Sequence, residues 1–396
     1  MNLLLTKSYT YGIMLFLVIS CTATSGKKNP DTLRTGAERT KLYLHLLKDQ
    51  KVGFVGNHTS MIGHTHLVDS LLKLGINIVR VFSPEHGFRG NADAGAVIAS
   101  GIDQKSGLPV ISLYGDHKKP TKDDLKDIEL FIFDIQDVGV RFYTYISTMT
   151  YVMEACAENN IPLIILDRPN PNGHYVDGPV LDTTFRSFIG LHAVPVVHGM
   201  TVGEYARMLN GEGWLENGLQ CDIKLIPVEN YTHHTFYELP VNPSPNLKNM
   251  NAIYLYPSLC FFEGTIVSVG RGTKHPFEVF GHPDFAIGSY VFTPESMKGA
   301  GNPKYEGQNC YGTSLISYTK TSGIPYQINL SWLFNYYDYF KEKDGFFNSY
   351  FDKLAGTDKL RKKIENGISK EEIKISWQDD LNAFKKIRKK YLLYDE

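Results

Sequence analysis

Side chains that can act as acids, bases or hydrogen-bonding groups follow four strand-like apolar runs, at the point where each run ends. The runs and the residues after them are VGFVG before Asn57, IVRVF before Ser83-Pro84-Glu85-His86-Gly87, LFIF before Asp134, and LIIL before Asp167. Runs of Val, Ile, Leu and Phe without apolar–polar alternation are typical of strands buried on both faces of a parallel sheet. Ligands bind outside the carboxyl ends of such strands. The sequence therefore predicts an α/β enzyme with an acidic, amide-rich cleft along one sheet edge.

Glu85 is the first candidate for catalysis. It follows Pro84 and precedes His86 and Gly87, so the sequence predicts a tight turn around its carboxyl group. A carboxyl group in a partly closed cleft can have a raised pKa and act as a general acid. The structural alternative is a carboxylate that caps the turn. The position at a strand end favours function, with His86 as a neighbouring substrate-binding candidate.

A second cluster follows the third run. Asp134 and Asp137 are further catalytic candidates there, and the substrate-binding candidates are Gln136, Arg141 and Tyr143. The aromatic residues after Arg141 could offer a stacking face and a phenolic donor. The alternative is that Asp137 and Arg141 form an ion pair while the aromatic rings pack in the core.

A loop with two prolines follows the fourth run. Its candidate ligand-binding side chains are Asp167, Arg168, Asn170 and Asn172. A rigid loop suits the recognition of a hydroxyl-rich ligand because little conformational entropy is lost on binding. A series of Asx turns that only stabilises the loop is the structural alternative.

Glu263 opens a glycine-rich segment in the second half of the chain and is another catalytic candidate. Arg271 lies between Gly270 and Gly272, where it could hold a carboxylate with two hydrogen bonds. A bulged or tightly turning strand is the alternative. The segment contains no phosphate-binding glycine motif, so no nucleotide cofactor is expected.

Histidines raise the question of a metal site. His58, His64, His66, His86 and His198 could in principle combine with Asp134. A predicted helix over 64–75 would turn His64 and His66 to different faces, and no H-E-x-x-H motif occurs. We therefore predict no metal. A serine-hydrolase elbow, G-x-S-x-G, is also missing from the sequence.

The chain has 396 residues, which favours two domains. Strand and helix patterns alternate from about residue 40, and helices are predicted over 147–159 and 201–215. The segment 121–128 begins with a capping-box pattern. This alternation predicts a doubly wound, mostly parallel sheet over 39–238. A smaller α+β domain is expected over 239–396, with amphipathic segments at 331–343 and 358–366 and a basic helix over 379–390. The net charge of −1 gives no reason to expect a nucleic-acid partner.

The first residues have the pattern of an export signal. Lys7 precedes an apolar stretch over 11–20, and Val-Ile-Ser-Cys ends at Cys21 in the manner of a bacterial lipobox. We predict a lipoprotein signal over 1–21, a tether over 22–38, and a periplasmic protein that contacts the membrane only through a lipid on Cys21. An ordinary secretory signal is the alternative. The other four cysteines match no zinc pattern, and buried free thiols are expected.

Several of these motifs together resemble the NamZ-type exo-β-N-acetylmuramidases, a glycoside hydrolase family. They are Ser-Pro-Glu-His-Gly at 83–87, Phe-Asp-Ile-Gln-Asp-Val-Gly-Val-Arg-Phe-Tyr-Thr-Tyr at 133–145, Leu-Asp-Arg-Pro-Asn-Pro-Asn-Gly at 166–173, Glu-Gly-Thr at 263–265 and Ser-x-Gly-Arg-Gly-Thr at 268–273. Pro-Ser-Pro-Asn at 243–246 and Lys-Lys-Tyr-Leu-Leu-Tyr at 389–394 belong to the same pattern. The resemblance therefore covers nearly the whole chain after the signal.

The resemblance implies that N-acetylmuramic acid is removed from the non-reducing end of peptidoglycan fragments, during wall turnover and recycling. It also implies a Rossmann-like domain, a smaller second domain, and a cleft between them with Glu85 as the acid. The second catalytic group is left open among Glu263, Asp134 and Asp137. From the residues alone, two rivals stand: a metal-dependent hydrolase that uses His86 and Asp134, and a non-catalytic muropeptide-binding lipoprotein.

Overall fold

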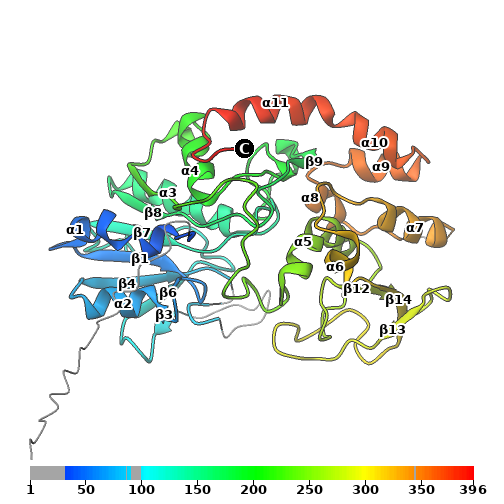
Figure 1. Ribbon diagram of the computed structural model, residues 1–396, viewed down its shortest axis with the longest axis horizontal. Coiled ribbons are helices and arrows are strands. Elements are labelled where there is room, and N and C mark those ends of the chain that lie inside the picture. Colours follow the sequence, from blue (N-terminus) through cyan, green and yellow to red (C-terminus); the bar gives the residue numbers. More distant parts are fainter. Residues whose placement is uncertain (1–31, 86, 91–99, 343–344) are drawn as a thin grey trace, which may run out of the picture. The chain divides into compact units, whose positions relative to one another are not determined.

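A seven-stranded sheet organises the first domain (Figure 1). The computed structural model describes residues 32–85, 87–90, 100–342 and 345–396, and Leu33–Glu396 form one unit. Across the sheet the strands are β11 (Ile223–Ile226), β8 (Leu163–Leu166), β7 (Leu130–Asp134), β1 (Val52–Gly56), β4 (Ile78–Ser83), β6 (Pro109–Ser112) and β5 (Gly101–Ile102). All neighbours run parallel except β5, which is antiparallel to β6.

The strand order confirms the predicted fold. From β6 to β11, the parallel strands follow the order 3-2-1-4-5-6 of doubly wound Rossmann sheets. The four runs singled out in the sequence are β1, β4, β7 and β8, which are neighbours in the sheet. Their carboxyl ends therefore lie along one edge, as predicted.

Helices cover both faces of this sheet because alternate side chains of each buried strand point to opposite faces. Phe131 and Phe133 of β7 pack in the same apolar cluster as helix α3 (Tyr145–Glu158). Ile132, between them, packs with helix α2 (Leu67–Lys73) on the other side. This two-sided burial explains why the strands read as continuous apolar runs.

The first domain also contains short elements around the sheet. They are α1 (Leu44–Leu47), β2 (Met61–Ile62), β3 (Thr65–His66), β9 (Asp177–Val180), β10 (Pro195–Val197) and α4 (Val202–Gly211). Thr201 caps α4 and forms a capping box with Glu204, so this predicted helix begins where its sequence signal lies.

The second, smaller domain is built on an antiparallel sheet with the strand order β12-β14-β13. Its elements are β12 (Val279–His282), β13 (Tyr290–Phe292), β14 (Cys310–Ser314), α5 (Met250–Leu259), α6 (Tyr318–Ser322), α7 (Ser331–Phe340), α8 (Phe351–Ala355), α9 (Lys359–Glu365) and α10 (Lys370–Ser376). The terminal helix α11 (Gln378–Lys389) returns to the first domain and packs along β9 (Figure 1). Arg388 of α11 donates two hydrogen bonds to the carbonyl of Gly199.

Two predicted helices are wrong in part. The helix expected over 64–75 begins only at Leu67, because Thr65 and His66 pair with Met61 and Ile62 in a hairpin. His66 instead caps α2. The segment 121–128 keeps the reciprocal bonds between Thr121 and Asp124, yet it forms turns and no helix.

The sequence predicts buried free thiols, and the structure confirms them. Cys156, Cys221, Cys260 and Cys310 are free, buried thiols. In the described part of the chain, no helix has the length and apolar character needed to cross a membrane. The predicted signal over 1–21 lies outside the described residues.

Candidate active site

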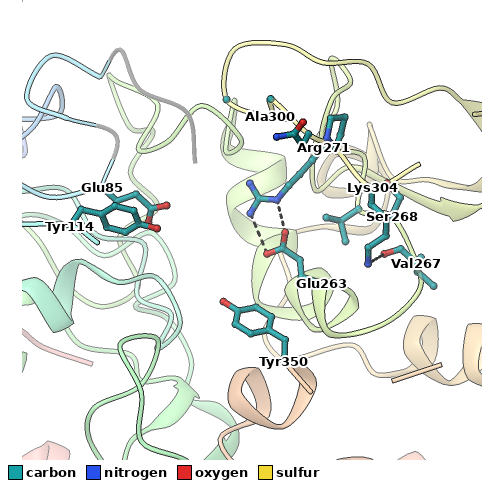
Figure 2. A pocket seen from close by; sticks show the side chains of 14 residues that line it. Glu85, Tyr114, Glu263, Val267, Ser268, Arg271, Ala300, Lys304 and Tyr350 are labelled. Carbon is teal, nitrogen blue, oxygen red and sulfur yellow. Dashed lines mark hydrogen bonds and ion pairs between the residues drawn. The ribbon is translucent and has the colours of Figure 1, made fainter. Parts of the chain in front are cut away.

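Two adjoining cavities, which share Glu85 and Arg271, form the candidate site, and Figure 2 shows the larger one. The larger has a volume of about 670 Å³, within the usual range for small-molecule sites. Its lining residues are Glu85, Tyr114, Glu263, Val267, Ser268, Val269, Arg271, Gly299, Ala300, Gly301, Asn302, Pro303, Lys304 and Tyr350. The smaller, of about 70 Å³, is lined in part by Tyr143. Of the sequence-predicted site residues, the structure thus brings together Glu85, Glu263, Arg271 and Tyr143.

Glu85 reaches the cavity from the first domain, beside Tyr114 (Figure 2). The two residues follow neighbouring strands, β4 and β6, whose last residues Ser83 and Ser112 are paired in register. Burial and the adjacent Glu85 carboxylate raise the pKa of Tyr114 to about 12. Tyr114 is therefore a neutral phenol at neutral pH and can donate a hydrogen bond to a carboxylate or a sugar oxygen.

Glu263 reaches the same cavity from the second domain, in the 3-10 helix η5 (Cys260–Gly264) that follows α5. Arg271 holds its carboxylate with two bonds: Nε lies 2.5 Å from Oε1, and Nη2 lies 3.2 Å from Oε2. Burial lowers the pKa of Arg271, but the Glu263 charge outweighs it and leaves that pKa above its ordinary value. The arrangement presents an anchored carboxylate to the cavity.

The glycines around Arg271 have a conformational reason. Gly270 and Gly272 adopt φ values of 73° and 81°, in the left-handed region that other residues rarely enter. Phe277 adopts φ 57° and places its ring 5.0 Å from the Arg271 guanidinium carbon. A non-glycine residue in this conformation is strained, which is typical of functional sites. The segment is an irregular loop that aims Arg271 at Glu263, so it is not the bulged strand that was the structural alternative.

Tyr143 borders the smaller cavity. Its hydroxyl donates a 2.7 Å hydrogen bond to the Pro243 carbonyl, in the proline- and asparagine-rich loop at 240–246. Asn246 of the same loop donates to the carbonyl of Gly299, which lines the larger cavity. Tyr143 therefore both borders the site and orders the loop beneath it.

The crevice at the ends of β1 and β7, where Rossmann folds often bind ligands, is filled by protein groups. Arg168 donates to both oxygens of Asp134, at 2.6 and 2.9 Å, and both side chains are buried. Burial raises the pKa of Asp134, and Arg168 opposes that shift. Asn57 accepts two bonds from Thr59 and is fully buried. These contacts favour a structural role for Asp134, Arg168 and Asn57.

Gln136 and Asp137 are also buried beside this crevice. The Gln136 amide donates to the carbonyls of Asp137 and Pro169, which fixes the backbone after β7 and β8. Asp137 Oδ1 accepts a 2.6 Å bond from the Gly139 amide, while Oδ2 has no hydrogen-bond partner among the described residues. Burial raises the pKa of Asp137 to about 7. Neither residue lines the two cavities.

The Asp167 loop is a rigid internal brace. Asp167 accepts hydrogen bonds from Thr201, the Gly203 amide and Tyr394, so it joins β8 to α4 and to the chain terminus. Asn170 donates to the Met200 carbonyl, and Asn172 donates to the Val138 carbonyl. The Asx-turn alternative therefore describes this loop better than a ligand-binding surface.

Arg141 lies outside the cavities. Its guanidinium donates to the carbonyls of Pro179, Val194 and Leu354 and is almost wholly buried. Burial lowers its pKa to about 9. The alternative of an ion pair with Asp137 is also not seen, since carbonyl oxygens occupy its Nη atoms. This placement favours a structural bridge over substrate binding.

The histidines are dispersed. His66 contacts the Asn57 carbonyl, and His198 accepts from the Met200 amide. Among the residues with a described position, no group of three or more His, Cys, Asp or Glu side chains could hold a metal ion. His86 lies outside the described residues.

Sequence reasoning missed three side chains in the larger cavity: Tyr114, Lys304 and Tyr350. Tyr114 follows β6, so the strand-end argument that found Glu85 would also have found it. Lys304 lies in the loop between β13 and β14, and Tyr350 lies directly before α8. Neither has a local signal, because only tertiary packing brings these segments to Glu263.

Comparisons with known proteins point to one family. Residues 52–251 match the family model for the N-terminal part of exo-beta-N-acetylmuramidase NamZ, and residues 254–394 match its C-terminal part. The chain is 37% identical to peptidoglycan beta-N-acetylmuramidase NamZ of Bacillus subtilis (strain 168), over 98% of this chain and 99% of that protein. Two crystal structures of DUF1343 family proteins from Bacteroides fragilis NCTC 9343 are similar. One has a TM-score of 0.84 and 49% identity, covering 92% of this chain and 99% of that one. The other has a TM-score of 0.77 and 28% identity, covering 93% and 100%.

Proposed function

Since the chain belongs to the exo-β-N-acetylmuramidase NamZ family, we propose that it is an exo-acting glycoside hydrolase. It releases terminal N-acetylmuramic acid from the non-reducing end of peptidoglycan fragments, in wall turnover and recycling. The observation that carries this proposal is one polar cavity with Glu85 on the first domain and Glu263 on the second (Figure 2). Glycosidases need two carboxyl groups that flank the scissile bond.

Glu85 acts as the general acid in this proposal. It lies at the end of a buried strand, and the Tyr114 phenol lies beside it in the cavity. Proton donation to the leaving oxygen relieves the negative charge that develops there as the glycosidic bond breaks. In a two-step route the same group, left as a carboxylate, can then deprotonate the incoming water; if water attacks directly, Glu263 is the base.

Glu263 supplies the second carboxylate. Both of its oxygens accept bonds from Arg271, so it is fixed before the substrate arrives. A fixed negative charge stabilises the oxocarbenium-like transition state without reorganisation. This role holds whether the first attack comes from Glu263, from water or from the substrate's own acetamido group.

The two alternative functions, a metal-dependent hydrolase and a muropeptide-binding lipoprotein, predict different experimental results. A metal-dependent hydrolase would lose activity on exhaustive chelation and regain it with one specific metal. A muropeptide-binding lipoprotein would bind muropeptides without turnover. A glycosidase built on Glu85 and Glu263 needs neither a metal nor a cofactor and turns its substrate over.

The direct test compares chromogenic β-N-acetylmuraminide and β-N-acetylglucosaminide as substrates for the purified protein. We expect hydrolysis of the muraminide with clear preference, and no effect of EDTA. Equal rates on both sugars would contradict the muramidase assignment, and turnover of neither would favour the binding protein.

We also propose that the chain is exported and held at the periplasmic side of the membrane by a lipid on Cys21. Support comes from the apolar stretch over 11–20 and the lipobox-like sequence that ends at Cys21. A lipid anchor would place the enzyme where wall fragments are released. Metabolic labelling with a palmitate analogue should mark the wild-type protein and not Cys21→Ser. Labelling of both would contradict the anchor site.

A further inference from the structure

The proposed substrate carries a negative charge that the cavity must accommodate. N-acetylmuramic acid differs from N-acetylglucosamine by a lactyl ether, whose carboxylate is ionised at neutral pH. Glu85 and Glu263 already bring two acidic groups to the cavity. A cationic side chain without an ion-pair partner would offset the lactyl charge, and this step rests on the proposed function. Two of the residues that line the larger cavity are basic, Arg271 and Lys304.

Arg271 is already committed to a protein carboxylate. Its Nε and Nη2 atoms both bind Glu263, and its planar group lies over the Phe277 ring. A second carboxylate at this guanidinium would compete with Glu263 for the same donors. The Glu263 carboxylate thus offsets the positive charge of Arg271, which the sequence offered as a carboxylate-binding residue.

Lys304 is differently placed. Its ammonium donates to two neutral carbonyls, Thr265 at 2.5 Å and Val267 at 3.2 Å. An ammonium has three N–H donors, so one is left for a ligand. Within the described residues, Lys304 forms no ion pair at 4 Å or less, and Figure 2 shows it on the Glu263 side of the cavity. Among the described residues, no carboxylate forms an ion pair with this ammonium, and Glu263 acts on it only from a greater distance.

Burial makes this charge costly. Burial lowers the pKa of Lys304, and the more distant Glu263 charge only partly opposes that shift. A carboxylate brought by a ligand would offset the desolvation of the ammonium, whereas a neutral hydroxyl would offset much less. An ammonium in this position favours a ligand that carries a negative charge over a neutral one.

We propose that Lys304 binds the carboxylate of the lactyl ether and is the residue that selects N-acetylmuramic acid over N-acetylglucosamine. A purely structural role is the competing explanation, since the two carbonyl bonds also fasten the loop at 299–303 to the segment at 265–267. The two explanations differ in one respect: an anchor affects all substrates alike, and a carboxylate partner affects only the charged one.

The test uses Lys304→Met, which keeps the aliphatic stem and removes the charge. Three chromogenic substrates are compared: the β-N-acetylmuraminide, its lactyl methyl ester, and the β-N-acetylglucosaminide. For the acid, we expect kcat/KM to fall roughly 10- to 100-fold, the loss of one charge-assisted bond. The change should fall mainly on KM, because the carboxylate is bound equally in the ground and transition states. The ester and the glucosaminide should change less than about threefold, well within that loss.

Controls separate the outcomes. Lys385→Met removes an exposed lysine on α11 and should leave all three substrates unaffected. Lys304→Arg should retain part of the preference for the acid over the ester. If Lys304→Met does not fold, Lys304→Gln is measured instead, since its amide can still donate to a carbonyl. An equal loss on all three substrates, or an unchanged preference, overturns the inference. Wild-type protein that fails to cleave the muraminide overturns the proposed function itself.

Discussion

Arg271 holds Glu263 through two hydrogen bonds, Nε to Oε1 at 2.5 Å and Nη2 to Oε2 at 3.2 Å, across eight residues of chain. The left-handed Gly270 and Gly272 allow the turn that makes this pairing geometrically accessible. The Phe277 ring beneath the guanidinium restricts it further. The segment 263–271 of the second domain therefore contains both the Glu263 carboxylate and the Arg271 guanidinium that orients it.

Arg271→Lys should lower kcat roughly 10- to 100-fold, because a lysine cannot hold both oxygens of Glu263 in one plane. The loss should be equal on the muraminide and the glucosaminide, since Arg271 acts through Glu263. Steady-state kinetics on both chromogenic substrates measure this. A selective loss on the muraminide alone would instead return lactyl recognition to Arg271.

Glu85→Gln should reduce kcat by about 10²- to 10⁴-fold, with little change in ligand binding. The amide cannot donate a proton in the way a carboxylic acid does, yet it keeps the shape of the side chain. Glu371→Gln, on the exposed side of α10, is the matched control and should be fully active. A folded Glu85→Gln protein with near-normal kcat would remove Glu85 from catalysis.

The fold could be predicted because its signals are local. The runs that became β1, β4, β7 and β8 are apolar on both faces, and this alone predicts a doubly wound parallel sheet. The same reasoning placed Glu85 correctly at a strand end. It also made Asp134 a catalytic candidate, as it did Glu85. Asp134 instead forms a buried ion pair with Arg168, which lies 34 residues further along the chain.

The rest of the site depends on contacts that no local pattern encodes. Asp167 follows its strand as Glu85 does, yet the α4 cap and Tyr394 enclose it. Lys304 reaches the cavity only because its loop binds the carbonyls of Thr265 and Val267. Position at a strand end identifies candidates, and tertiary partners decide which of them face a ligand.

Asp134→Ala should destabilise the fold by about 3–5 kcal/mol, because it leaves the buried Arg168 guanidinium without its counterion. The double variant Asp134→Ala with Arg168→Met should recover part of this loss, since no isolated charge is left. Urea unfolding of the two single variants and the double variant measures the coupling. Additive losses in the double variant would show that the pair is not the source of the effect.

Asp137 should make stability depend on pH. Burial raises its pKa from 3.8 to about 7, so the unfolded chain loses this proton at lower pH than the folded protein does. Its contribution is therefore most favourable below the unfolded pKa of 3.8 and is lost as the pH rises towards 7. The loss amounts to a few kcal/mol at most, at about 1.4 kcal/mol per pKa unit.

Asp137→Asn removes this titration and keeps an acceptor for the Gly139 amide. Relative to wild type, the variant should gain stability as the pH rises from about 4 to about 7, as measured by urea unfolding at several pH values. A stability difference that is independent of pH over this range would mean that Asp137 does not titrate there.

The central claim is that the cavity between Glu85 and Glu263 removes one terminal N-acetylmuramic acid from the non-reducing end. A defined glycan fragment of alternating N-acetylmuramic acid and N-acetylglucosamine, with the muramic residue at that end, tests it most directly. Mass spectrometry of the products should show free N-acetylmuramic acid and a fragment that is shorter by that one sugar. The shortened fragment, which now begins with N-acetylglucosamine, should resist further cleavage. Internal cleavage products, or no release of N-acetylmuramic acid, would contradict the account.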